Sequence, residues 1–207
     1  MPESETCYAE LMEERRDPNR ASVAMLRFLC ILLFAFCVLL FLFTQVLVGV
    51  QVCGESMSPT LYGGELASDG TYRGGDYLFV FTFASPDYGD IVVFHSDEEN
   101  EELIKRVIGL PGDTISAQGG VLYRTSADGE TVTVEEPYIA DGWRGNIRPY
   151  TVPEGCLYVL GDNRNNSLDS RSFGAIEEES VLGVATGWSL ACKEFLSDLF
   201  SFFRIAA

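Results

Sequence analysis

The stretch CGESMSPTL, residues 53–61, contains a serine, Ser56, that could act as a nucleophile if a base took its proton. In most serine hydrolases that base is histidine. The chain has one histidine, His95, which ends an apolar segment before an acidic loop, where histidine is more often structural. Lysine is the alternative base, and the chain has only two lysines, Lys105 and Lys193, the second in the C-terminal tail.

Lys105 lies in the segment LIKRVIG (103–109), whose alternation predicts a β-strand with Leu103, Lys105 and Val107 on one face. Burial on an apolar face would lower the pKa of a lysine from its usual value of about 10.4, and a neutral amine can act as a general base. Periodicity alone favours a plainer role, in which the stem packs while the ammonium group reaches solvent. Both roles are open at this level.

An apolar run over residues 28–52 precedes Ser56 and contains no charged residue. It is long enough to cross a hydrocarbon core of about 30 Å and longer than the apolar segment of a cleaved signal peptide, so we expect an uncleaved transmembrane anchor. Four arginines precede the run, and the first basic residue after it is Arg73. The positive-inside rule therefore predicts a cytoplasmic leader over residues 1–27 and an extracytoplasmic remainder at the cell membrane.

Residues 53–190 are predicted to form a β-rich domain, because short apolar or alternating segments are separated by Gly, Pro, Asp and Ser. The predicted strands cover residues 76–83, 90–95, 103–109, 120–124, 131–134, 156–161 and 181–188. We expect a mainly β fold, with a small antiparallel or barrel-like sheet outside the membrane. Residues 191–207 form an amphipathic tail that is predicted either to lie on the membrane or to pack on the domain.

Composition bears on the possible partners. The net charge of −17 repels polyanions, so nucleic acid is not expected as a partner. The six cysteines show no CxxC or Cys/His spacing, and we expect neither a metal nor another cofactor. A disulfide between two of Cys53, Cys156 and Cys192 is an open alternative. The oligomeric state has no signal in the sequence.

Four blocks occur in the order GESMSPTL (54–61), GDIVVF (89–94), IKRVIGLPGD (104–113) and GDNRNNSLDSRSFG (161–174). In this order they resemble the blocks of the bacterial type I signal peptidases. The resemblance covers about residues 28–188 and implies a Ser/Lys dyad, with Ser56 as nucleophile and Lys105 as general base, that works through an acyl-enzyme. It implies secretory preproteins as substrates, cleaved after small residues at A-x-A-like sites, with the lipid bilayer as a further partner.

The resemblance also implies supporting residues. The Ser56 N–H would donate to the oxyanion beside Gly54, where the Gram-positive pattern has glycine and other members have a serine donor. Ser167 would hold Lys105 in its orientation. Met57, Leu103 and Ile104 are expected to line the substrate pocket. Structural ion pairs are expected from Arg106, Asp162, Asp169 and Arg171, with Arg106 as the partner of Asp162.

Two other functions fit part of the sequence. A self-cleaving Ser/Lys protease of related fold is one, although such proteins are cytosolic and carry a DNA-binding or regulatory arm. A catalytically inactive, membrane-tethered peptide-binding module is the other, and only the presence of both Ser56 and Lys105 argues against it. A lysine base further predicts that activity falls as the pH drops and Lys105 becomes protonated.

Overall fold

The computed structural model describes residues 20–68, 70, 72–96, 100–139 and 142–205. These residues belong to two compact units, Met1–Gln45 and Val46–Ala207. Most of the predicted cytoplasmic leader, including Cys7, lies outside the described residues. The first unit consists of one helix in its described part, and every described strand lies in the second.

Helix α2 (Arg20–Val46) is almost entirely apolar, and within it Ala21–Phe41 is long and apolar enough to cross a membrane, with a mean hydropathy of 2.8. The predicted anchor, residues 28–52, therefore differs from the helix at both ends. Residues after Val46 instead form strand β1 (Leu47–Gln51), which pairs with β4 (Tyr77–Phe81). Two valines and a glycine in LVGVQ favour this pairing, because they are poorer helix formers than the leucines before them.

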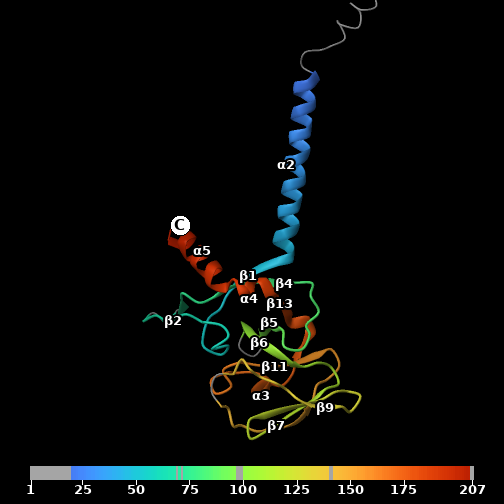
Figure 1. Ribbon diagram of the computed structural model, residues 1–207, viewed down its shortest axis with the longest axis vertical. Coiled ribbons are helices and arrows are strands. Elements are labelled where there is room, and N and C mark those ends of the chain that lie inside the picture. The colour runs from blue at the N-terminus through green and yellow to red at the C-terminus, as the bar shows by residue number, and fades with distance from the viewer. Residues whose placement is uncertain (1–19, 69, 71, 97–99, 140–141, 206–207) are drawn as a thin grey trace, which may run out of the picture. The chain divides into compact units, whose positions relative to one another are not determined.

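A seven-stranded antiparallel sheet forms the larger part of the second unit, in the order β1-β4-β13-β5-β6-β11-β12 (Figure 1). Its remaining strands are β13 (Val181–Ala185), β5 (Ile91–Ser96), β6 (Glu101–Gly109), β11 (Cys156–Leu160) and β12 (Ile176–Glu177). Alternation is clear in β4, where Leu78 and Val80 are fully buried between half-buried aromatic residues. The central strand β5 is buried over most of its length.

A second antiparallel sheet has the order β10-β7-β8-β9, and β2 and β3 form a separate hairpin. Their bounds are β2 (Glu65–Leu66), β3 (Tyr72–Arg73), β7 (Thr114–Gln118), β8 (Val121–Thr125), β9 (Thr131–Thr133) and β10 (Ile147–Thr151). All seven predicted segments contain a strand, which confirms the mainly antiparallel β fold. The described strands form open sheets rather than a closed barrel.

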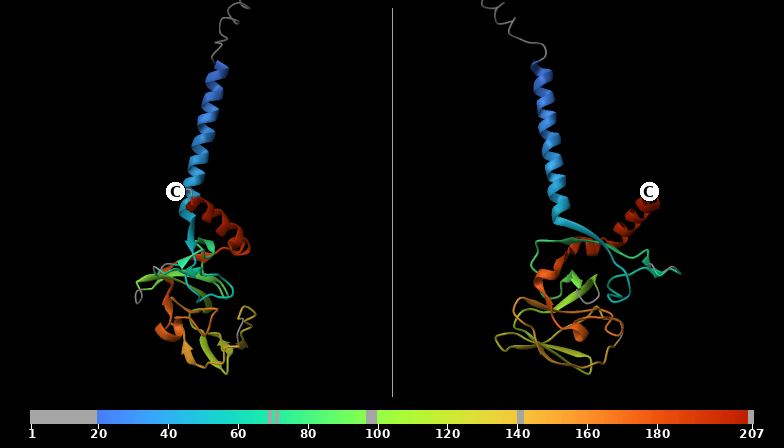
Figure 2. Two further views of the ribbon diagram at one scale, coloured as in Figure 1. Left: turned by 90° about the vertical axis from the view of Figure 1, so that its left-hand side faces the viewer. Right: turned by 180° about the vertical axis from the view of Figure 1, so that it is seen from behind.

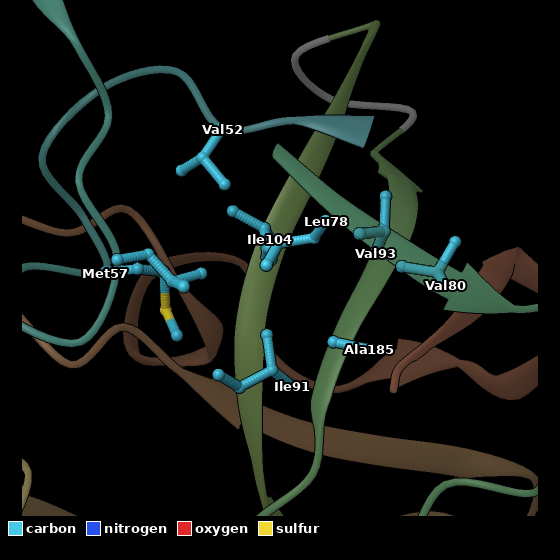
Figure 3. Packing of buried hydrophobic residues seen from close by; sticks show 9 residues of the cluster. Val52, Met57, Leu78, Val80, Ile91, Val93, Ile104 and Ala185 are labelled. Atoms are coloured by element: carbon cyan, nitrogen blue, oxygen red, sulfur yellow. The ribbon is translucent and has the colours of Figure 1, made fainter. Parts of the chain in front are cut away.

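One hydrophobic cluster joins the loop after β1 to the large sheet. Met57, which is 1% exposed, packs there with Val52 from its own loop and with Ile91 and Ile104 from β5 and β6 (Figure 3). Deep burial of a side chain next to Ser56 ties the backbone of the serine to the sheet. Two further clusters, built around Phe94 and around Ile115, complete the core.

The chain ends in two helices, α4 (Gly187–Ala191) and α5 (Lys193–Ile205), after the short elements α3 (Ser170–Phe173) and η1 (Glu178–Ser180). Both views in Figure 2 place α5 beside β4, at the end of the domain opposite the four-stranded sheet. Leu196 of α5 is 7% exposed, whereas Phe195 is 67% exposed. The start of the predicted tail therefore packs on the domain through Leu196, while Phe195 lies on its exposed face.

Candidate active site

Ser56 and Lys105 meet in the structure. The Nζ atom of Lys105 lies 2.9 Å from Ser56 Oγ and 2.8 Å from the carbonyl oxygen of Ile104. Lys105 is placed by β6, where its register partner on β5 is Val92, and Ser56 by the irregular segment that follows β1. Two residues from different blocks of the sequence are thus at hydrogen-bond distance, as a nucleophile and its base must be.

The surroundings of Lys105 weaken its positive charge. The residue is 2% exposed, and burial lowers the pKa of its amine to about 8, against a smaller opposing effect from the carboxylates of Asp169 and Asp162. The amine therefore loses its proton near pH 8, well below the pKa of an exposed lysine. Its two contacts are with neutral oxygen atoms, which accept a hydrogen bond without holding the proton as a carboxylate would.

The segment around Ser56 depends on Gly54. This residue has a φ of +82°, in the left-handed region that favours glycine, and its N–H donates to the Gly63 carbonyl at 3.1 Å. A serine at position 54, the alternative pattern of the family that the sequence resembles, would be strained in this conformation. The Ser56 N–H makes no hydrogen bond among the described residues, so it is free to donate to an oxyanion.

Arg106 and Asp162 form the expected ion pair. The guanidinium donates from Nε to Oδ1 at 2.8 Å and from Nη2 to Oδ2 at 2.6 Å, and its Nη1 donates to the Gly89 carbonyl at 2.7 Å. Thr60 Oγ1 also donates to Asp162 Oδ2, at 2.5 Å. Asp162 therefore connects β6, next to Lys105, with the segment that carries Ser56.

Asp169 and Arg171 form a second pair of the same kind. Arg171 Nε donates to Asp169 Oδ1 at 2.7 Å, and Nη2 donates to Oδ2 at 2.8 Å. The Asp169 carboxylate, which has no exposed surface, also caps α3 by accepting from the Arg171 N–H and accepts from the Gly161 N–H at 3.0 Å. These contacts fix the chain from β11 to α3, which passes beside Ser56.

Ser167 is close to the dyad but does not hold Lys105. Its Oγ is buried and has no hydrogen-bond partner, although the resemblance assigned it the role of orienting the lysine. It lies against Gly161, where an added Cβ would be 2.1 Å from Ser167 Oγ and 2.6 Å from the Ser56 carbonyl oxygen.

The three expected pocket residues do not share one surface. Met57 and Ile104 lie in the same cluster, where they are 1% and 8% exposed. Leu103 instead packs against the cluster around Phe94. Alternation along β6 explains the separation, because Leu103 and Ile104 are neighbours and point to opposite faces. Met57 and Ile104 could form only the floor of a pocket.

Several residues of the site were not predicted. Arg164 forms an ion pair with Glu136, and its Nε donates to the Gly161 carbonyl at 3.0 Å. The guanidinium of Arg106 stacks on Tyr138, 4.0 Å from the ring centroid. Arg164 could have been found from the sequence, because it lies in one of the four quoted blocks. Glu136 and Tyr138 lie in none of them.

His95 is placed away from the dyad. It is exposed on β5 opposite Glu102, while Lys105 is opposite Val92, about 10 Å back along the strand. The structure thus brings Lys105, and not the single histidine, to Ser56. Cys53, Cys156 and Cys192 are free thiols.

Comparison with known proteins gives related sequences. Residues 25–188 match the family described as signal peptidase, peptidase S26. The chain is 37% identical to the signal peptidase I of Bacillus licheniformis over 143 residues, 64% of this chain and 70% of that protein. It is 34% identical to the signal peptidase I of Bacillus caldolyticus over 176 residues, 72% and 82% of the two chains. A crystal structure of a signal peptidase I from Enterococcus faecalis V583 is 33% identical and covers 50% of this chain and 98% of its own, with a TM-score of 0.43.

Proposed function

Because the chain belongs to the signal peptidase family S26 and is a serine endopeptidase that removes signal peptides, we propose that Ser56 and Lys105 are its catalytic dyad. The observation that carries the proposal is the 2.9 Å contact between Ser56 Oγ and the Nζ of a buried lysine. With its pKa lowered to about 8, the amine is available in its neutral form at the pH of ordinary enzyme assays.

Neutral Lys105 takes the proton of the Ser56 hydroxyl as Oγ attacks the carbonyl carbon of the scissile peptide bond. The developing oxyanion accepts a hydrogen bond from the Ser56 N–H. The Lys105 ammonium then gives its proton to the departing amine, and the small residue of the signal peptide remains as an ester on Ser56. The amine, neutral again, activates a water molecule that hydrolyses the ester and restores Ser56.

An extended peptide would reach the dyad along β6. Strand β5 pairs with residues 101–106 of β6, whereas β11 pairs with β6 only between Arg106 and Gly109. Among the described strands, residues 101–105 therefore have a partner on one side only, and a peptide that adds on the other side would run beside Lys105. We expect Met57 and Ile104, which share one buried cluster, to form a shallow floor that suits the small side chains of an A-x-A site.

The proposal includes attachment of the protein to the membrane and the orientation of its chain. Helix α2 is the anchor, with the leader in the cytoplasm and the domain from Val46 onward outside. Strand β1 follows this helix in the chain and precedes Ser56, so the helix ends at Val46, whereas the predicted anchor extends to Val52. The apolar part of a signal peptide occupies the same bilayer, and its cleavage site emerges on the side of the domain.

The experiment is cleavage of a preprotein with an Ala-x-Ala site by the full-length protein in lipid vesicles. Ser56→Ala is expected to lower kcat by about 10⁴-fold or more, because the nucleophile is lost. Ser58→Ala, which removes the other hydroxyl of the same segment, is the matched control and should keep activity within a few fold. Cleavage that persists in Ser56→Ala would disprove the dyad. Binding of the preprotein without any cleavage by the unaltered chain would favour the peptide-binding module.

A further inference from the structure

Helix α5 begins at Lys193, beyond residue 188, where the match to the family ends. Its first turn nevertheless contacts the domain through polar atoms as well as through Leu196. The Tyr77 N–H donates to Ser197 Oγ at 2.9 Å, and Ser197 Oγ donates to the Lys193 carbonyl at 2.7 Å. These bonds fix the start of α5 against the first residue of β4.

The side chain of Lys193 reaches the segment that carries Ser56. Its Nζ lies 3.3 Å from Asp76 Oδ2 and donates a short hydrogen bond to the carbonyl oxygen of Thr60. The side chain of Lys193 is 26% exposed and that of Asp76 8% exposed, so the pair is largely shielded from solvent. Lys193 is the one lysine besides Lys105, and the proposed chemistry does not use it.

Asp76 in turn closes the base of that segment. The Val52 N–H donates to the Asp76 carbonyl at 2.8 Å, and the Asp76 N–H donates to the Tyr62 carbonyl at 2.8 Å. The Tyr62 N–H donates to Asp76 Oδ2, the oxygen that faces Lys193, at 2.9 Å. Both ends of residues 52–62, which include Ser56, are therefore held by one aspartate whose charge Lys193 balances.

Thr60 links this arrangement to the dyad. Its carbonyl oxygen accepts from Lys193, while its hydroxyl donates to Asp162, the partner of Arg106. We propose that Lys193 is a positioning residue, through which the C-terminal helix sets the placement of Ser56 relative to Lys105. This inference rests on the proposed dyad but concerns a residue outside the matched family region.

Loss of Lys193 is expected to change the distance between Ser56 and Lys105. Without Lys193, the buried Asp76 carboxylate loses its counter-charge and the Thr60 carbonyl loses its donor, so residues 52–62 gain freedom. Displacement of a nucleophile by a fraction of an ångström lowers the rate of the chemical step much more than it lowers substrate binding. The effect should therefore appear in kcat rather than in KM.

The test compares Lys193→Met, Lys193→Arg and Glu194→Gln in the full-length protein in lipid, with preprotein cleavage and thermal unfolding measured for each. Glu194 is the exposed neighbour of Lys193 on α5 and serves as the control. We expect Lys193→Met to lower kcat at least tenfold with KM within threefold, Lys193→Arg to recover at least a third of the activity, and Glu194→Gln to match the unaltered chain. A kcat for Lys193→Met within twofold, or a loss that only follows the unfolded fraction, would overturn the inference and leave the dyad standing.

Hydrogen exchange tests, independently of cleavage, whether Lys193 restrains residues 52–62. In Lys193→Met we expect the amides of residues 52–62, above all that of Tyr62, to exchange at least tenfold faster than in the unaltered chain. Unchanged exchange there would overturn the inference, even if the preprotein proved not to be a substrate. Failure of the proposed function would instead be seen as absence of cleavage by the unaltered chain itself.

Discussion

Lys105 and Arg106 are neighbours on β6, and both are largely removed from water, but their surroundings are opposite in kind. Arg106 has a carboxylate on two of its nitrogens, a carbonyl oxygen on the third and an aromatic ring against its face. Lys105 has a hydroxyl and a carbonyl oxygen. The strand thus holds one cation in its charged form and allows its neighbour to lose its proton. A guanidinium keeps its proton at any assay pH, and the carboxylate offsets the cost of burying that charge, whereas burial without a carboxylate contact lowers the pKa of the Lys105 amine.

The carboxylates nearest to Lys105 are already paired. Asp162 contacts Arg106, and Asp169 contacts Arg171. Both carboxylates raise the pKa of Lys105, but less than burial lowers it. Because each carboxylate is balanced by a guanidinium, its field at the amine is reduced. The two ion pairs therefore support the neutral form of the lysine as well as the geometry of the site.

The largest effect is expected when Lys105 is replaced by arginine, so that both neighbours on β6 are permanently charged. Lys105→Arg places a guanidinium, which keeps its proton at any assay pH, where the base should be. General bases contribute about 10²- to 10⁴-fold, so kcat for preprotein cleavage should fall by about 10³-fold or more. The reciprocal change, Arg106→Lys, keeps a charge beside Asp162 and is expected to cost about tenfold or less. Retention of more than a tenth of the activity by Lys105→Arg would rule out a lysine base.

A second test removes the carboxylate from the charged neighbour. Asp162→Asn leaves the Arg106 side chain, 11% exposed, without its partner, and the free energy of unfolding should fall by about 3–5 kcal/mol. Denaturant unfolding of the full-length protein in detergent measures it. Glu179→Gln, at an exposed carboxylate, should change stability by less than about 0.5 kcal/mol. A loss below about 1 kcal/mol for Asp162→Asn would show that the pair is not what keeps Arg106 in place.

The smallest effect is the dependence on pH. Only the neutral amine of Lys105 can accept a proton, and its pKa of about 8 means that the active fraction falls about tenfold for each pH unit below that value. The kcat/KM for a preprotein should therefore be about 100-fold lower at pH 6 than on the alkaline plateau. In Asp162→Asn the loss of a charge that raises this pKa should move the acid limb to lower pH. A flat profile between pH 6 and 8 would exclude titration of Lys105 in the catalytic step.

Much of the fold could be predicted because the strands show their pattern locally. Strands such as β4 and β5 have clear apolar segments bounded by turn residues. Strand β7 was missed because TISAQ has few large apolar residues, and β1 because LVGVQ continues the apolar run of the helix. At that junction the sheet partner, not the local sequence, decides where the helix ends.

Part of the candidate site could be predicted from the sequence, and part of its supporting contacts could not. The proposed dyad of Ser56 and Lys105 and the Arg106–Asp162 pair followed from the resemblance carried by the four blocks. The contact of Glu136 with Arg164 joins residues that are distant in sequence and have no local signal. Lys193 was assigned only to an amphipathic tail, since a helical pattern does not reveal which backbone carbonyl a side chain will reach.

Gly161 has a consequence for anyone who would engineer this protein. Any side chain there would overlap the Ser167 hydroxyl and the backbone beside the nucleophile, and neither can move away without disturbing the site. A saturation library should therefore find this position as intolerant as Ser56, although it contributes no functional group. The site therefore requires the absence of a side chain at position 161 as well as the presence of its catalytic groups. Glu101 and Glu102 of β6, whose side chains are exposed, are the better place to diversify when a new cleavage preference is sought.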